Sequence, residues 1–242
     1  MPDYPFRTLS YPIFGRYPEV EARTVWVPEQ LFRQFSKQTD RWEQAFEIVQ
    51  RELFPHEPVA WAEQVHSHGV ALVASPGQSH SADGLVTDIP GMFLLIRTAD
   101  CASVMIYDPE HRIVANLHAG WRGAQEGIIP RGISLMQRTF HSQPSRLLVA
   151  VSPTIRDCCY QVGPEFRNYF AEQYFVQRKG KIFLNLPRLL KHQLIESGVG
   201  EGNIQVVEHC TFCHPNEYPS YRRTGSANRM FHLIRMKKEV TL

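Results

Sequence analysis

Three residues of metal-binding types, His66, Cys101 and His118, lie where apolar segments give way to turns. Such segment ends are positions where side chains from distant parts of a chain can converge on a cleft. Two imidazoles and a thiolate suit zinc, and a catalytic zinc site commonly has three protein ligands and one open position. Bound zinc lowers the pKa of water to about 7, which makes hydroxide available at neutral pH. The same soft donors could hold copper, so the residue types indicate a metal site without fixing the metal.

Two other interpretations use the same residues. The histidines could be polar strand ends and Cys101 a small buried residue, and the wide spacing along the chain by itself favours this. Alternatively, Cys101 follows Asp100 and could be a nucleophile that a nearby histidine activates, as in a cysteine hydrolase.

Hydrophobic periodicity predicts the elements that position these residues. Helices are expected from residue 28 through residue 35 and at 41–53, 127–139, 164–174 and 187–197, the last ending at Gly198. Strands are expected at 24–27, 59–67, 69–75, on both sides of 98–101, at 112–119, 146–153 and finally 204–210. The strand before His118 should end in a glycine-rich turn at Gly120 and Gly123, and an irregular tail should follow residue 210. Strands and helices mix without strict βαβ alternation, which predicts one α+β domain over residues 1–242.

Composition narrows the class of protein. The chain has 242 residues, 43% of them hydrophobic, and its net charge is only +2 from 26 basic and 24 acidic residues. This balance gives no electrostatic case for a nucleic-acid partner or an anionic membrane. No apolar run approaches the ~20 residues that span a bilayer, and the first residues lack a secretory leader, so a cytoplasmic location is expected. Five cysteines, with Cys158 and Cys159 adjacent, indicate reduced thiols or metal ligands rather than a disulfide framework.

Five short motifs occur in a fixed order. They are Gln64-Val65-His66, Ala82-Asp83-Gly84, Thr98-Ala99-Asp100-Cys101, His118-Ala119-Gly120-Trp121-Arg122-Gly123 and Tyr221-Arg222-Arg223. Together they resemble the laccase-domain family, also called the multicopper polyphenol oxidase-like or peptidoglycan editing factor family. The H-A-G-W-R-G motif is the most specific, and the resemblance runs from about Pro58 to Arg229.

This resemblance implies a zinc site formed by His66, Cys101 and His118 in a layered α/β/β/α sandwich with mixed sheets. It also implies a purine nucleoside phosphorylase that acts on adenosine, inosine and methylthioadenosine and that deaminates adenosine. Its small-molecule partners would be a purine nucleoside and phosphate. Members are also described as copper-dependent phenol oxidases and as factors that keep L-serine out of peptidoglycan precursors, and both roles stay as alternatives.

Several residues near the motifs have both a functional and a structural interpretation. Arg122, expected in the turn after His118, could bind phosphate bidentately or brace that turn. Arg222 and Arg223 pose the same question, and one of them is expected to be structural. Asp100 could fix a histidine tautomer, act as a general base or make a buried structural hydrogen bond.

The remaining motif residues raise similar choices. Asp83 is expected to be a turn residue, with a role in the pocket as the alternative, and Trp121 could stack on a purine or belong to the core. His209, Cys210, Cys213 and His214 form a cluster that could bind a second zinc. The sequence departs from the family pattern at Gln161, where an acid is common, and at residues 226–229, which leaves substrate preference open.

Overall fold

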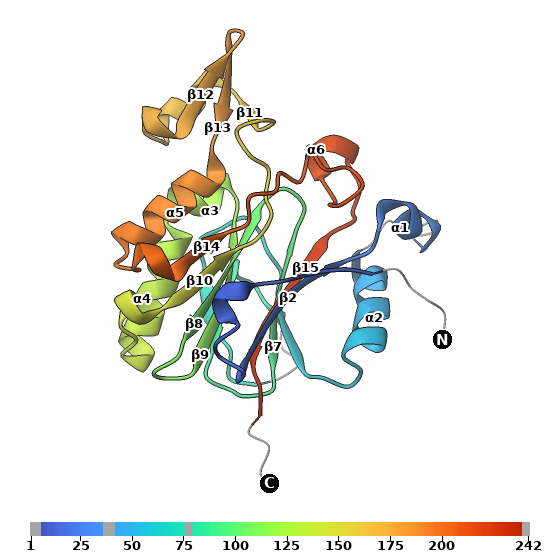
Figure 1. Cartoon of the computed structure of the whole chain (residues 1–242), viewed down its shortest axis with the longest axis vertical. Coiled ribbons are helices and arrows are strands. Elements are labelled where there is room, and N and C mark those ends of the chain that lie inside the picture. Colours follow the sequence, from blue (N-terminus) through green and yellow to red (C-terminus); the bar gives the residue numbers. More distant parts are fainter. Residues whose placement is uncertain (1–5, 36–41, 76–78, 239–242) are drawn as a thin grey trace.

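The computed structural model describes residues 6–35, 42–75 and 79–238 (Figure 1). Its strands are β1 (Arg7–Ser10), β2 (Val20–Trp26), β3 (Val59–Ala62), β4 (Val70–Leu72), β5 (Ser79–His80), β6 (Gly84–Thr87), β7 (Phe93–Thr98), β8 (Ala102–Asp108), β9 (Ile113–Ala119), β10 (Leu148–Val151), β11 (Gln161–Val162), β12 (Phe175–Arg178), β13 (Lys181–Leu184), β14 (Ile204–Val206) and β15 (Met230–Met236). Its α-helices are α1 (Glu29–Phe35), α2 (Trp42–Leu53), α3 (Trp121–Glu126), α4 (Ile128–Phe140), α5 (Leu186–Glu196) and α6 (Tyr221–Thr224).

Two six-stranded mixed sheets form the centre of the molecule. The first has the order β1-β2-β15-β7-β3-β5 and the second the order β14-β10-β8-β9-β6-β4. Most neighbours are antiparallel, whereas β3 pairs in parallel with β5 and β7, β4 with β6, and β10 with β14. A small third sheet, β11-β13-β12, projects beyond one end of the sandwich (Figure 1).

Helices cover the outer face of each large sheet. Phe46 and Val49 of α2 pack in one cluster with Phe231 of β15, on the outer face of the first sheet. Ile129 and Ile133 of α4 pack in another cluster that covers the second sheet. A third cluster fills the space between the sheets. The predicted α+β class and the layered α/β/β/α sandwich are therefore confirmed.

Strand β8 shows how the sequence builds these layers. All of its residues are buried, so its two faces meet different parts of the core. Val104 and Ile106 point to the helix-covered side, whereas Met105 and Tyr107 point to the space between the sheets. This is the two-residue period of a strand buried on both faces.

The structure corrects three predicted elements. Residues 121–126 form the helix α3, with Gly120 as its N-cap, so the expected glycine-rich turn is wrong. The expected helix at 164–174 is replaced by two short 3-10 segments, Pro164–Asn168 and Glu172–Tyr174.

The third correction concerns the end of the chain. The last strand is β15, which lies between β2 and β7, rather than the one predicted at 204–210. His232 makes β15 look too polar for a buried strand. Its ring nitrogens lie 2.7 and 2.8 Å from the hydroxyls of Thr24 and Thr98, which satisfy them inside the core. Among the described residues, no helix is long and apolar enough to cross a membrane.

Candidate metal centre and its cleft

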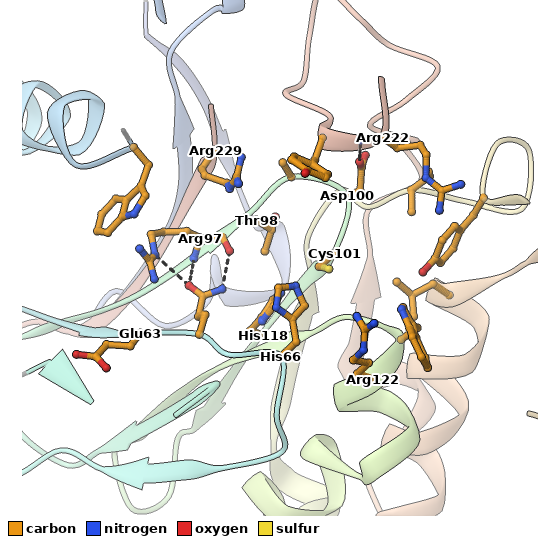
Figure 2. Close-up of a pocket in the computed structure, with 18 residues that line it drawn as sticks. Glu63, His66, Arg97, Thr98, Asp100, Cys101, His118, Arg122, Arg222 and Arg229 are labelled. Carbon is orange, nitrogen blue, oxygen red and sulfur yellow. Dashed lines mark hydrogen bonds between the residues drawn. The ribbon is translucent and has the colours of Figure 1, made fainter. Parts of the chain in front are cut away.

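The structure brings His66, Cys101 and His118 together. His66 lies in the loop after β3, Cys101 in the connection between β7 and β8, and His118 near the end of β9. Their donor atoms all lie within 4.8 Å of one another, and the two imidazole rings have centroids 4.9 Å apart (Figure 2). His118 is buried, Cys101 half-buried and His66 exposed, so the group opens on one side to solvent.

Asp83 forms hydrogen bonds that fix the positions of His66 and His118. Its Oδ1 accepts hydrogen bonds from Nδ1 of His118 at 2.8 Å and from the backbone N–H of His66 at 3.0 Å. Its Oδ2 accepts from the backbone of Val65 and from both the backbone and the hydroxyl of Ser67. The carboxylate is fully buried, and it leaves Nε2 of His118 free to face the group. Asp83 is therefore more than the turn residue that its Asp-Gly context predicts.

The backbone around the donors adopts conformations that side chains disfavour. Gln64, His66 and Asp100 have φ angles of 40°, 61° and 89°, in the left-handed region. Gly120 is required for a different reason, because a Cβ atom there would lie 2.8 Å from Sγ of Cys101. These observations indicate that the fold imposes the positions of the donors.

Electrostatics favours a thiolate in this group. Burial disfavours ionisation of Cys101, but the charges and hydrogen bonds of His118 and His66 outweigh it and lower the pKa of the thiol to about 6. Burial likewise disfavours protonated His118, yet Cys101 and Asp83 raise its pKa to about 9. Burial would raise the pKa of Asp83, but hydrogen bonds from His118 and Ser67 lower it to about 2. The charges of the Asp83 carboxylate, the His118 imidazolium and the Cys101 thiolate thus alternate from one group to the next.

The donors lie in the wall of a cleft of about 600 Å³. Four guanidinium groups line it, together with the rings of four aromatic residues (Figure 2): Arg97, Arg122, Arg222 and Arg229, and Trp42, Trp121, Tyr160 and Tyr221. Glu63 and Asp100 are the acidic residues of the lining. The cleft therefore combines a positive charge excess with flat apolar surfaces, which suits an anion bound beside an aromatic ring.

The predicted arginines occupy different positions. Arg122 lies on α3 with its guanidinium 4.4 Å from the ring centre of Trp121, and it borders the cleft. Arg222 also borders the cleft and donates to the carbonyl of Gln161. Arg223 donates instead to the carbonyls of residues 211, 212 and 218, which is the structural role expected for one of this pair.

Two cleft arginines, Arg97 and Arg229, were not among the predicted site residues. Arg97 donates from its backbone and side chain to Oε1 of Gln64, and its guanidinium lies 3.8 Å from the ring centre of Trp42. Arg229 ends the 226–229 segment that departs from the family pattern. Charge alone could not have distinguished these two from the other arginines of the chain.

Asp100 faces away from the histidines. Its carboxylate accepts from the hydroxyl of Thr211 at 2.6 Å and from the backbone of Arg222 at 2.7 Å. Its carbonyl accepts from Thr154 and Ile155. Asp100 thus ties the Cys101 turn to three other segments of the chain, which matches its structural interpretation.

The side chains present fit a zinc ion. Each of His66, Cys101 and His118 offers one donor atom, and three such ligands with an open side are what a catalytic zinc site uses. The second predicted cluster is rearranged. Nδ1 of His209 bonds to Tyr218 and Nδ1 of His214 to a carbonyl, whereas Cys210 and Cys213 group with two other cysteines.

Comparisons with known proteins agree with the sequence motifs. A family model described as multi-copper polyphenol oxidoreductase laccase matches residues 29–237. The purine nucleoside phosphorylase of Aquifex aeolicus is 34% identical over 66% of this chain and 74% of its own length. Purine nucleoside phosphorylase YlmD of Geobacillus stearothermophilus is 31% identical over 78% of this chain and 76% of its own.

Solved structures share the fold. The Bacillus licheniformis hypothetical protein YfiH superposes with a TM-score of 0.82 at 24% identity, covering 96% of this chain and 99% of that one. The structure of YlmD from Geobacillus stearothermophilus gives a TM-score of 0.76 at 25% identity, covering 94% of both chains. The motifs, the matched segment and the fold lead to one conclusion: the chain belongs to the multi-copper polyphenol oxidoreductase laccase family.

Proposed function

We propose that this protein is a zinc-dependent purine nucleoside phosphorylase that acts on adenosine, inosine and methylthioadenosine and also deaminates adenosine. The names of its curated relatives support the first activity. The observation that carries the proposal is the cleft itself, where a His₂Cys donor group opens beside four guanidinium groups and four aromatic rings.

The arginines would bind the phosphate. A guanidinium matches phosphate oxygens bidentately and stays charged at every physiological pH. Arg122 and Arg222 are exposed at the cleft, so they can reach an anion without breaking a buried network. Arg97 is half-buried, and its hydrogen bonds to Gln64 hold it on the other side of His66 and Cys101 from Arg122 (Figure 2).

Aromatic residues would bind the purine. The ring of Trp121 stands on α3 beside Arg122, and Tyr221 is 58% exposed at the rim. Burial raises the pKa of Tyr160, and the charge of Cys101 raises it further, so its phenol stays protonated and can donate a hydrogen bond. A neutral donor in the cleft can approach a ring nitrogen or a phosphate oxygen.

The two reactions differ in their nucleophile. In phosphorolysis a phosphate oxygen bonds to C1′ of the sugar, the bond from C1′ to the base breaks, and the base takes up a proton. In deamination the oxygen of water replaces the amino group on the purine, which leaves as ammonia. Zinc held by His66, Cys101 and His118 would supply Lewis acidity at the cleft.

The test is to incubate purified, zinc-loaded protein with adenosine, with and without phosphate, and to follow adenine and inosine. We expect adenine only with phosphate and inosine in both conditions. Cys101→Ala should abolish both products, whereas Arg131→Ala, an exposed arginine of α4 outside the cleft, should change neither. Zinc-loaded protein that forms no product in either condition would refute the proposal.

Metal analysis separates this proposal from a copper-dependent phenol oxidase. Reduction of oxygen by four electrons needs several coppers, and among the described residues the cleft holds a single three-donor group. Zinc bound without copper after purification from cells given both metals would support the phosphorylase. A role in peptidoglycan editing instead requires that muropeptides outcompete nucleosides for the cleft.

A further inference from the structure

A second group of possible metal ligands lies outside the cleft. It consists of Cys158 and Cys159, from the connection between β10 and β11, and Cys210 and Cys213, from the loop after β14. Their four sulfur atoms all lie within 4.8 Å of one another. We propose that these four cysteines bind a structural zinc ion that joins the two loops. This inference does not depend on the proposed activity.

The distances suit a tetrahedral ion. Zinc–sulfur bonds of about 2.3 Å in a tetrahedron place the sulfurs about 3.8 Å apart. Sγ of Cys213 lies 3.3 Å from Sγ of Cys158 and 3.0 Å from Sγ of Cys159. Small side-chain rotations would move these sulfurs apart to that spacing. All four thiols are free, and Cys213 is near two partners at once, which is the geometry of a shared ion rather than of one disulfide.

The local backbone is also that of a thiolate site. Cys210 and Cys213 have the C-x2-C spacing that zinc sites commonly use. Backbone groups of Phe212, Cys213 and Arg156 form hydrogen bonds with the sulfur of Cys210, which is the buried member of the four. Four cysteine ligands, with no carboxylate or imidazole among them, select zinc over harder cations.

The position of the group indicates what the ion would do. The two loops already meet through a bridge between Thr154 and Cys210. Tyr160, next to Cys159, lines the cleft, and Thr211, next to Cys210, donates to Asp100 beside the Cys101 turn. A closed four-ligand site here would fix one wall of the cleft without taking part in chemistry. Cys158 and Cys213 are exposed, so the ion can enter from solvent.

The test compares two single cysteine substitutions, Cys213→Ser and the matched control Cys101→Ser, with the wild-type chain. Zinc per chain is measured after purification, and Co²⁺ is then substituted to record its spectrum. We expect Cys213→Ser to bind one zinc fewer than wild type. We expect Cys101→Ser to keep the intense absorption of Co²⁺ bound by four thiolates, and Cys213→Ser to lose it.

Three results would overturn the proposal. These are equal zinc content in wild type and Cys213→Ser, iron in place of zinc in the four-cysteine group, and intact mass showing disulfides among these cysteines in protein purified with reductant. If Cys213→Ser does not fold, the Co²⁺ spectrum of Cys101→Ser still tests the proposal, because absence of the four-thiolate absorption would refute it. If the cleft binds no zinc but the four cysteines do, wild type should contain one zinc per chain instead of two. Cys213→Ser should still contain one zinc fewer than wild type.

Discussion

Substitution of Asp83 by asparagine tests whether this residue orients the metal centre. The carboxylate accepts five hydrogen bonds and donates none, whereas an amide has one acceptor oxygen and one donor group. If the amide nitrogen replaces Oδ2, it opposes two backbone N–H groups. If it replaces Oδ1, it opposes only the N–H of His66 together with Nδ1 of His118. The second orientation leaves fewer donors unsatisfied and should be the one adopted.

That orientation has a consequence at His118. Its Nδ1 would have to accept a hydrogen bond, so the proton moves to Nε2, the atom that should bind the metal. Loss of such an orienting partner typically weakens metal binding by about 10–100-fold. One buried N–H left unsatisfied at His66 should cost about 1–3 kcal/mol of the free energy of unfolding.

Zinc affinity is measured by competition with a chromophoric chelator, and stability by urea denaturation. Ser67→Ala is the matched control, because it removes one hydrogen bond to Asp83 but keeps the charge and the partner of His118. It should cost about 1 kcal/mol of stability and leave zinc affinity unchanged. Asp83→Asn protein that folds and binds zinc as tightly as wild type would refute the argument.

Three further predictions follow from single contacts. Arg122→Ala should raise the KM for phosphate by about 10–100-fold in a steady-state assay, because a charge-assisted hydrogen bond contributes about 1.5–3 kcal/mol. The rate of adenosine deamination, measured without phosphate, should change little. Gly120→Ala should lower the free energy of unfolding in urea by about 1–3 kcal/mol, because its Cβ would overlap Cys101, whereas Gly202→Ala, with no atom within 4 Å, should stay near wild type. Burial lowers the pKa of His232, and the positive charge of His118 acts in the same direction, so that this pKa falls from its usual 6.5 to about 3. Between about pH 3 and pH 6.5 the unfolded chain therefore binds more protons than the folded one. Stability should therefore fall as the pH drops, by about 2 kcal/mol from this group at pH 5, and His232→Gln should flatten that slope; an equally steep slope would contradict the assignment.

The grouping of His66, Cys101 and His118 could be predicted because the motifs around them resemble a known family, whereas their spacing alone favoured ordinary strand ends. The segment before His118 is apolar apart from Asn116, and the strand predicted there matches β9. Strand β15 could not be recognised in the same way, because His232 and Arg235 interrupt its apolar pattern. Their partners lie far away in the sequence; Glu21, for example, is 214 residues from Arg235.

Long-range pairing also explains what was missed at the two sites. Asp83 stands in an Ala-Asp-Gly context that is typical of a turn, and only the folded chain brings it to His118. The histidines flanking Cys210 and Cys213 suggested a local zinc cluster. The true neighbours are Cys158 and Cys159, which reach that loop because β10 and β14 pair in parallel.

The two groups of metal ligands differ in how the fold supports them. Around the cleft, left-handed residues such as His66 each cost about 1–3 kcal/mol, and they persist because Asp83 and its hydrogen bonds determine the loop. The cleft donors are therefore positioned before any ion binds. The four-cysteine group has two exposed members, and a short bridge joins its loops, so an ion would order those loops. Removing zinc with a chelator should thus speed hydrogen exchange in residues 154–163 and 207–213 much more than in the loop around His66. If zinc removal changes the hydrogen-exchange rate of both regions by the same factor, the cysteine loops, too, are fixed by the fold alone.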